Sequence, residues 1–164
     1  MEQHVIATEL SAAGAQELLA ATSSAHLAYN AQDGTPRVIP VGYFWTGIEF
    51  VISTATTSPK VAALQARPDV ALSINGGDTP EQARALSVRG RASVEIVDGL
   101  VSEYLAAARK SMGDEAAAEF EKNCREMYDQ MARIAIVPSW VRFYDFGAGR
   151  MPKFLRQLAE RNRA

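Results

Sequence analysis

The chain has 164 residues, of which 48% are hydrophobic and 22% are charged, a composition typical of a single domain with a packed core. Seventeen Lys and Arg against 19 Asp and Glu give a formal net charge of −2, so we expect no nucleic-acid partner. Cys124 is the only cysteine, which excludes an internal disulfide and a cysteine metal cluster. No other residues occur at the spacing typical of metal ligands, so we expect no metal site.

The beginning of the chain and its apolar runs predict a cytoplasmic protein. Residues 1–4 are not the start of a basic segment followed by a long apolar stretch, so no secretory signal is predicted. No apolar run approaches the roughly 20 residues that span a bilayer, and we expect no membrane partner. The sequence predicts one domain over residues 1–164.

The hydrophobic pattern predicts a mainly β fold with peripheral helices, of the α+β class. A short helix is expected over Ser11–Ala21, with Ser11 as its N-cap. Six strands are then predicted at Ala25–Asn30, Arg37–Phe44, Ile48–Thr54, Val70–Asn75, Ala85–Val97 and Arg133–Phe146. Short turns between the first three strands predict an antiparallel meander, because parallel neighbours need a longer crossover.

Helices are predicted around this β framework. A single short helix is expected at Pro59–Ala66, between the third and fourth strands. A helical insertion is expected over about 99–132, with Asp98 and Asp114 as N-caps, and a C-terminal helix over about 152–163. Six strands with one small helix in this position predict a closed or nearly closed barrel.

The most specific local feature is Ser58-Pro59-Lys60, at the start of the helix that follows the third strand. Ser58 is a favourable N-cap, and Pro59 suits the first helical position because its missing N–H is not needed there. The helix N-terminus and the Lys60 ammonium together favour binding of an anion such as a phosphate monoester. A capped helix with a solvated lysine is the alternative interpretation.

The second feature is the strand that begins at Arg37. Alternation places Arg37, Ile39 and Val41 on one face, and Val38 and Pro40 on the other. Since Pro40 has no N–H, this strand must have an open edge or a bulge. Its exposed backbone can receive the edge of a flat ring, although a proline that protects an edge strand from aggregation gives the same pattern.

The order of these features resembles the pyridoxamine 5′-phosphate oxidase-like family of flavin-binding split β-barrels. The resemblance covers about Leu27–Arg91 and Trp140–Phe154. It includes the stretches 33–41, 53–54, 58–60, 67–72 and 88–92. It implies a six-stranded antiparallel split barrel that binds FMN at a homodimer interface and transfers hydride to or from a small organic substrate.

The resemblance also implies roles for individual residues. Those expected along the flavin ring and ribityl chain are Arg37, which also reaches toward the phosphate, Val38, Ile39, Pro40, Val41, Ser53 and Thr54. Ser58 and Lys60 are expected to hold the phosphate. The partner subunit is expected to complete the pocket with Tyr144, Arg150 and, as a looser match, Lys153.

The chain departs from the oxidase that makes pyridoxal phosphate. That enzyme has an arginine and a histidine in its C-terminal substrate motif, whereas this chain reads Arg150-Met151-Pro152-Lys153. The sequence therefore indicates a divergent branch, with no catalytic residue assigned. Two alternatives stay open: a deazaflavin-dependent reductase, whose coenzyme tail would contact Arg150, Lys153 and Arg156, and a flavin- or haem-binding module without turnover, with His26 as the candidate haem ligand.

Overall fold

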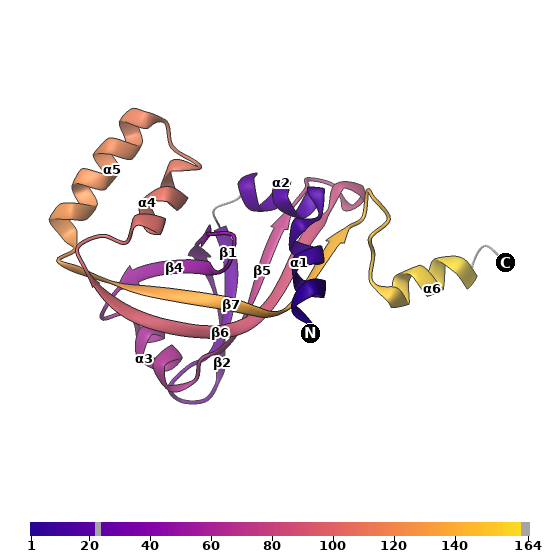
Figure 1. Cartoon of the computed structure of the whole chain (residues 1–164), viewed down its shortest axis with the longest axis horizontal. Coiled ribbons are helices and arrows are strands. Elements are labelled where there is room, and N and C mark those ends of the chain that lie inside the picture. The colour runs from indigo at the N-terminus through magenta and orange to yellow at the C-terminus, as the bar shows by residue number, and fades with distance from the viewer. Residues whose placement is uncertain (22–23, 162–164) are drawn as a thin grey trace.

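The computed structural model describes residues 1–21 and 24–161. Its strands form one antiparallel sheet in the order β2-β1-β5-β6-β7-β4-β3 (Figure 1). The strands are β1 Ser24–Asn30, β2 Pro36–Gly42, β3 Phe44–Trp45, β4 Phe50–Ala55, β5 Asp69–Gly76, β6 Arg84–Asp98 and β7 Gln130–Asp145. The helices are α1 Gln3–Ser11, α2 Ala13–Ala21, α3 Pro59–Ala66, α4 Ser102–Arg109, α5 Asp114–Met127 and α6 Lys153–Arg161, with a 3₁₀ turn at Pro80–Gln82. The predicted α+β class is confirmed.

The sheet curls so that strands near its two ends approach each other. β2 forms one edge and β3 the other, yet β2 lies beside β4. The two longest strands, β6 and β7, pair over their whole lengths and cross the molecule from end to end (Figure 1). This curvature produces an incompletely closed barrel whose interior holds the main apolar core.

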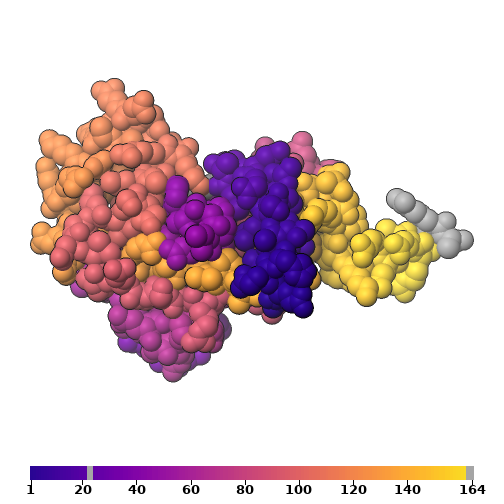
Figure 2. Space-filling model, viewed as in Figure 1, coloured from indigo at the N-terminus to yellow at the C-terminus, as the bar shows by residue number. Residues whose placement is uncertain are grey.

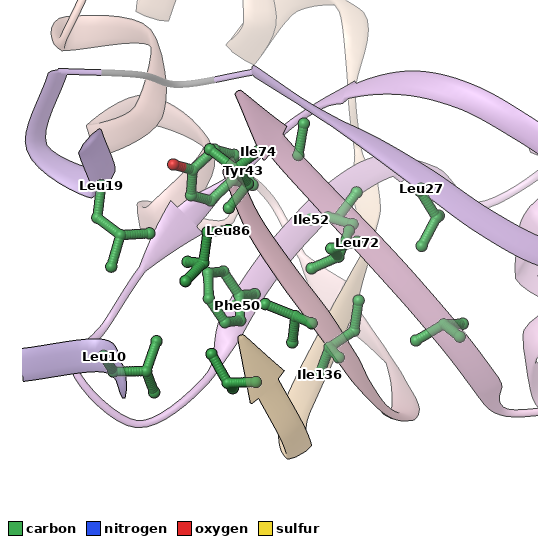
Figure 3. Close-up of a cluster of buried hydrophobic side chains, with 14 of the residues drawn as sticks. Leu10, Leu19, Leu27, Tyr43, Phe50, Ile52, Leu72, Ile74, Leu86 and Ile136 are labelled. Carbon is green, nitrogen blue, oxygen red and sulfur yellow. The ribbon is translucent and has the colours of Figure 1, made fainter. Parts of the chain in front are cut away.

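Apolar side chains from most strands fill that interior. Leu27, Phe50, Ile52, Leu72 and Ile136 are all almost fully buried, and Figure 3 shows them pointing into the same space. Their alternation with outward residues follows the two-residue repeat of a strand. α1 packs against β7, and α2 packs against β5 and β6. The N-terminal helices therefore close one side of the core (Figure 2).

The prediction of a meander over the first three strands is half wrong. β1 and β2 form the expected hairpin, but β2 does not pair with the next strand. Instead β4 pairs with β7 and with the two-residue strand β3. The predicted strand 37–44 is divided at Tyr43, whose fully buried side chain belongs to the main core. The described sheet consequently has seven strands rather than six.

The predicted helix caps are wrong at three positions and partly right at Ser58, which is the N-cap residue of α3. Ser11 ends α1 instead of starting the next helix, and its hydroxyl donates to the Thr8 carbonyl. Asp98 ends β6 and accepts a hydrogen bond from the Gln130 side chain. Ser58 and Asp114 lie at helix starts, but neither provides a side-chain cap. Asp98 and Ser58 have other polar partners, and Ser11 lies in α1, a helix that was not predicted from the sequence.

The insertion between β6 and β7 packs on the outside of the barrel. Its helix α4 contacts β4, β3 and β2, and a small second cluster of Val51, Val101 and Met131 is buried beneath it. Two helices, α4 and α5, lie within the range predicted for the insertion, although β7 already begins at Gln130. At the opposite end α6 extends away from the body, with none of its residues buried (Figure 1).

Candidate cofactor site

The open side of the barrel lies between β2 and β4, and we call this region the split. β2 pairs only with β1, so its other edge is free among the described strands. β3 covers β4 only at Phe50 and Val51, which leaves the later residues of β4 without a strand on that side. The open edge predicted from Pro40 is therefore confirmed, and unpaired backbone groups border the split.

β2 presents a mixed surface to this region. Ile39 and Val41 pack against the core, whereas Val38 is 67% exposed and Pro40 is exposed beside it. The structure thus reproduces the two predicted faces of this strand. It also leaves an apolar patch at a free strand edge, a surface on which a flat ring can pack.

Arg37 stands at the start of β2 in a small polar network. Its guanidinium bonds the Asp33 carboxylate at 3.0 Å and contacts the Thr35 hydroxyl. Hydrogen bonds from the Thr35 hydroxyl and amide, followed by the effect of Arg37, lower the pKa of Asp33 to about 2. Arg37 is therefore partly neutralised by its own hairpin and is less available to an anion than an unpaired arginine.

Lys60 has the opposite environment. Its ammonium donates to the Ser58 hydroxyl at 2.8 Å and to the Thr54 hydroxyl at 3.3 Å, and the side chain is half-buried. No carboxylate pairs with it in the described part of the chain. Burial lowers the pKa of Lys60, because partial removal from water disfavours its charged form. Such a cation gains most from an incoming anion.

The structure brings Thr54, Ser58 and Lys60 together but separates Ser53 from them. Neighbouring residues of a strand point to opposite faces, so Thr54 shares a face with the core residue Ile52 and Ser53 faces outward. The Ser53 hydroxyl is buried there without a hydrogen-bond partner. That Ser53 and Thr54 both contact the flavin ring or ribityl chain stays a prediction. Their hydroxyls lie on different faces of β4.

Ser53 faces a cavity of about 270 Å³ beneath α4, which we call the α4 cavity. The cavity is open on one side and is bordered by the end of β2, by β4 and by one face of α4. Its lining residues are Gly42, Tyr43, Val51, Ser53, Glu103, Tyr104, Ala107 and Ala108.

Sequence reasoning missed an ion network at the edge of this cavity. Arg133 on β7 pairs opposite Ser53, and its guanidinium binds both Glu103 and Glu49. Burial opposes ionisation of Glu103, but hydrogen bonds from Arg133 and from Ser102 outweigh it and lower the pKa of the carboxyl. The three charged residues come from segments that are far apart in the sequence. The sequence shows their opposite charges but does not indicate that they pair.

The residues predicted to complete a partner's pocket gather in a second region. Tyr144, Arg150 and Lys153 line an open groove of about 910 Å³ near α6, which we call the C-terminal groove. Its remaining lining residues are Glu9, Arg142, Phe143, Met151, Pro152, Phe154, Arg156 and Gln157. Arg150 bonds Glu9 at 2.8 Å, and Arg142 lies 3.5 Å from the same carboxylate.

A single chain does not bring the two predicted halves of the site together. α3, which carries Lys60, and α6, beside the C-terminal groove, lie in different parts of the molecule (Figure 1). The remaining candidates lie elsewhere: His26 is exposed on β1, and Cys124 is buried in α5, where burial raises the pKa of its thiol. The prediction of a buried Cys124 is confirmed.

A family comparison decides the assignment of the chain. The family model for pyridoxamine 5′-phosphate oxidase matches residues 12–144, which include the split, Lys60 and the helical insertion. The chain belongs to the pyridoxamine 5′-phosphate oxidase family. The split-barrel fold expected from the sequence is therefore confirmed, with the added strand β3. A comparison with curated proteins found no match.

Solved structures support the same fold for this family member. The conserved hypothetical protein Rv2991 from Mycobacterium tuberculosis is similar with a TM-score of 0.63 and 21% identity, over 93% of this chain and 89% of that one. An F420 reductase is similar with a TM-score of 0.57 and 26% identity, over 77% of this chain and 94% of that one. HutZ, the haem storage protein from Vibrio cholerae, is similar with a TM-score of 0.56 and 14% identity, over 79% of this chain and 90% of that one.

Residues 1–21 and 24–161 contain no helix that is both long and apolar enough to cross a bilayer, and no group of three or more His, Cys, Asp or Glu residues placed to hold a metal ion. The half-buried Lys60, its two hydroxyl partners and the free edge of β2 nevertheless fit a phosphate-bearing planar cofactor, since they offer a cation without a counter-ion beside an open apolar surface.

Proposed function

We propose that this family member is an oxidoreductase that binds FMN in the split, with the cofactor phosphate on Lys60. The observation that carries the proposal is the Lys60 ammonium, which is half-buried and bonded only to the hydroxyls of Thr54 and Ser58 in the described part of the chain. A phosphate would supply the negative charge that this ammonium lacks, through short charge-assisted hydrogen bonds.

The remaining residues of the split support this arrangement. The Ser58 hydroxyl makes no cap hydrogen bond to α3, so it is able to turn from Lys60 toward a phosphate oxygen. The free edge of β2, from Arg37 to Val41, would lie along the flavin ring and ribityl chain. Arg37 would reach the phosphate only by giving up part of its contact with Asp33. We therefore assign the larger electrostatic contribution to Lys60.

The site requires a second copy of the chain in this proposal. Tyr144, Arg150 and Lys153 lie in the C-terminal groove, apart from Lys60, and would complete the split of the partner subunit in a homodimer. Groups from two subunits exclude water from the ring more fully than an open strand edge does.

The division of labour between cofactor and protein follows from these residues. The bound flavin would supply hydride transfer to or from a small organic substrate. The chain would supply binding, orientation and a partly dry environment, and we assign no acid, base or nucleophile. A cytoplasmic location is part of the same proposal.

The C-terminal groove favours a second candidate, a deazaflavin coenzyme in place of FMN. Four basic side chains, from Arg142, Arg150, Lys153 and Arg156, line this groove against the single carboxylate of Glu9. Such an excess suits a coenzyme with an acidic tail beyond its phosphate. The structural similarity to an F420 reductase at 26% identity, F420 being a deazaflavin, also supports this alternative.

An absorption spectrum of the purified protein tests the proposal, with mass spectrometry of any molecule released on denaturation. We expect flavin bands in the purified protein, or flavin bands that stay with the protein through gel filtration after FMN is added to a colourless preparation, and a dimer by light scattering. Failure to bind FMN together with tight binding of the deazaflavin would support the second candidate. A Soret band that is lost in His26→Ala would instead indicate a haem-binding module.

A further inference from the structure

The α4 cavity contains a hydrogen-bonding group that the fold leaves unused. The Ser53 hydroxyl is buried without a partner among the described residues, and Ser53 is one of the residues that line the cavity. Since burying an unpaired hydroxyl is unfavourable, a native structure keeps such a group most readily where a ligand satisfies it. The Ser53 hydroxyl can donate and accept hydrogen bonds, so it can pair with either a donor or an acceptor atom of a ligand.

The shape of the cavity suits a compact ring system. Its walls are largely apolar, with the ring of Tyr104 and the side chain of Val51 around the small side chains of Ala107 and Ala108. The space exists because α4 presents these two alanines to β4 rather than larger residues. An apolar cavity of roughly 150 Å³ is enough for benzene, so about 270 Å³ has room for one or two fused rings.

The charges around the cavity disfavour an anion. Arg133 is shared between Glu49 and Glu103, so the two carboxylates outnumber the one guanidinium. Of these three residues Glu103 lines the cavity itself. An anionic ligand would meet the Glu103 carboxylate in a partly dry environment, where repulsion is stronger than in water. The environment therefore favours a neutral molecule.

We propose that the α4 cavity binds a small, neutral aromatic molecule through a hydrogen bond to Ser53, and that molecules of this class are the substrates. Gly42 lines the cavity and ends β2, the strand that borders the split, so a ligand held here lies next to the cofactor site. The substrate role rests on the proposed function, whereas binding in the cavity does not.

Equilibrium dialysis against three probes of one shape tests the proposal: 1-naphthol, naphthalene and 1-naphthoate. At neutral pH we expect 1-naphthol to bind most tightly and 1-naphthoate most weakly. Ser53→Ala should weaken 1-naphthol binding about three- to tenfold, the usual contribution of one hydrogen bond, and should leave naphthalene unchanged. Ala108→Phe, which fills the cavity, should remove binding of both.

Ala118→Phe is the matched control, because Ala118 is exposed on α5 and does not line the cavity. Circular dichroism and the thermal midpoint show that each variant is folded. Should Ala108→Phe fail to fold, Ala107→Leu replaces it. The proposal is overturned if 1-naphthoate binds as tightly as 1-naphthol, or if Ser53→Ala weakens both neutral probes equally.

Repeating the dialysis with FMN separates this proposal from the proposed function. We expect 1-naphthol and FMN to bind together. Displacement of one by the other would show that the cavity belongs to the cofactor site and would overturn a separate substrate site. Binding of 1-naphthol without any binding of FMN would support the cavity but refute the proposed oxidoreductase, and the reverse result would refute the cavity alone.

Discussion

The split and the C-terminal groove are both basic, yet their cations are held in different ways. Lys60 in the split is half-buried, with two hydroxyl partners and no paired carboxylate in the described residues. Arg150 in the groove is exposed and already bound to Glu9. The number of basic residues is larger in the groove, but a cation that lacks a counter-ion is the better indicator of a phosphate site.

The reason lies in the cost of displacing an existing partner. An anion that approaches Arg150 must compete with the Glu9 carboxylate, whereas one that approaches Lys60 replaces only weaker bonds to neutral hydroxyls. Partial burial also reduces screening by water and salt around Lys60. We therefore expect the phosphate affinity to depend mainly on the split, and the groove to adjust it.

The largest effect should come from Lys60→Ala. Loss of a charge-assisted phosphate contact, worth about 1.5–3 kcal/mol, should weaken FMN binding by more than tenfold in a fluorescence titration. Lys122→Ala, at an exposed position of α5, is the matched control and should bind as the parent protein does. An unchanged affinity in Lys60→Ala would remove the distinction between the two regions.

A smaller effect is expected when the pairing in the groove is changed. Glu9→Gln removes the carboxylate that holds Arg142 and Arg150. If one exposed pair is worth up to about 1 kcal/mol, affinity for an acidic coenzyme tail should rise up to about fivefold. Isothermal titration with the deazaflavin coenzyme measures this change. Arg150→Ala should give the opposite sign, and a loss as large as that in Lys60→Ala would make the groove the main phosphate site.

Ser58→Ala sharpens the description of the split itself. The Ser58 hydroxyl is not used as a helix cap, so its removal should cost little stability while one neutral hydrogen bond to the ligand is lost. That bond is worth about 0.5–1.5 kcal/mol, and we expect FMN affinity to fall about threefold with an unchanged thermal midpoint. A large drop in the midpoint would show that the serine acts on the helix instead.

The smallest effect should be seen in a pH titration. Because burial lowers the pKa of Lys60, its charge is lost as pH rises through a range below that of an ordinary lysine, and FMN affinity should fall with it. Lys60→Arg, whose guanidinium stays charged, should lose this alkaline dependence while the titration of the flavin remains. Parallel pH profiles of the two proteins would show that loss of the Lys60 charge does not weaken FMN binding in this range.

Local signals in the sequence were sufficient for several parts of the fold. The limits of α3 agree with the prediction Pro59–Ala66, because a proline at the start and the Arg67-Pro68 pair at the end are both unambiguous in sequence. The β1–β2 hairpin followed from the Asp33-Gly34 turn, and the open edge of β2 followed from Pro40. These features depend on backbone chemistry within a few residues.

The sequence by itself thus determined the family, the main strands and the residues around Lys60. Only the tertiary structure decided which strands border the split and what surrounds the side chains of Ser53 and Thr54 on the two faces of β4. It also decided that Arg133 forms ion pairs with both Glu49 and Glu103. These outcomes depend on contacts between segments far apart in the chain, and the energy of such contacts is fixed by the geometry of packing rather than by any local pattern. The α4 cavity is of this kind, since it exists only where two alanines of one helix meet one strand.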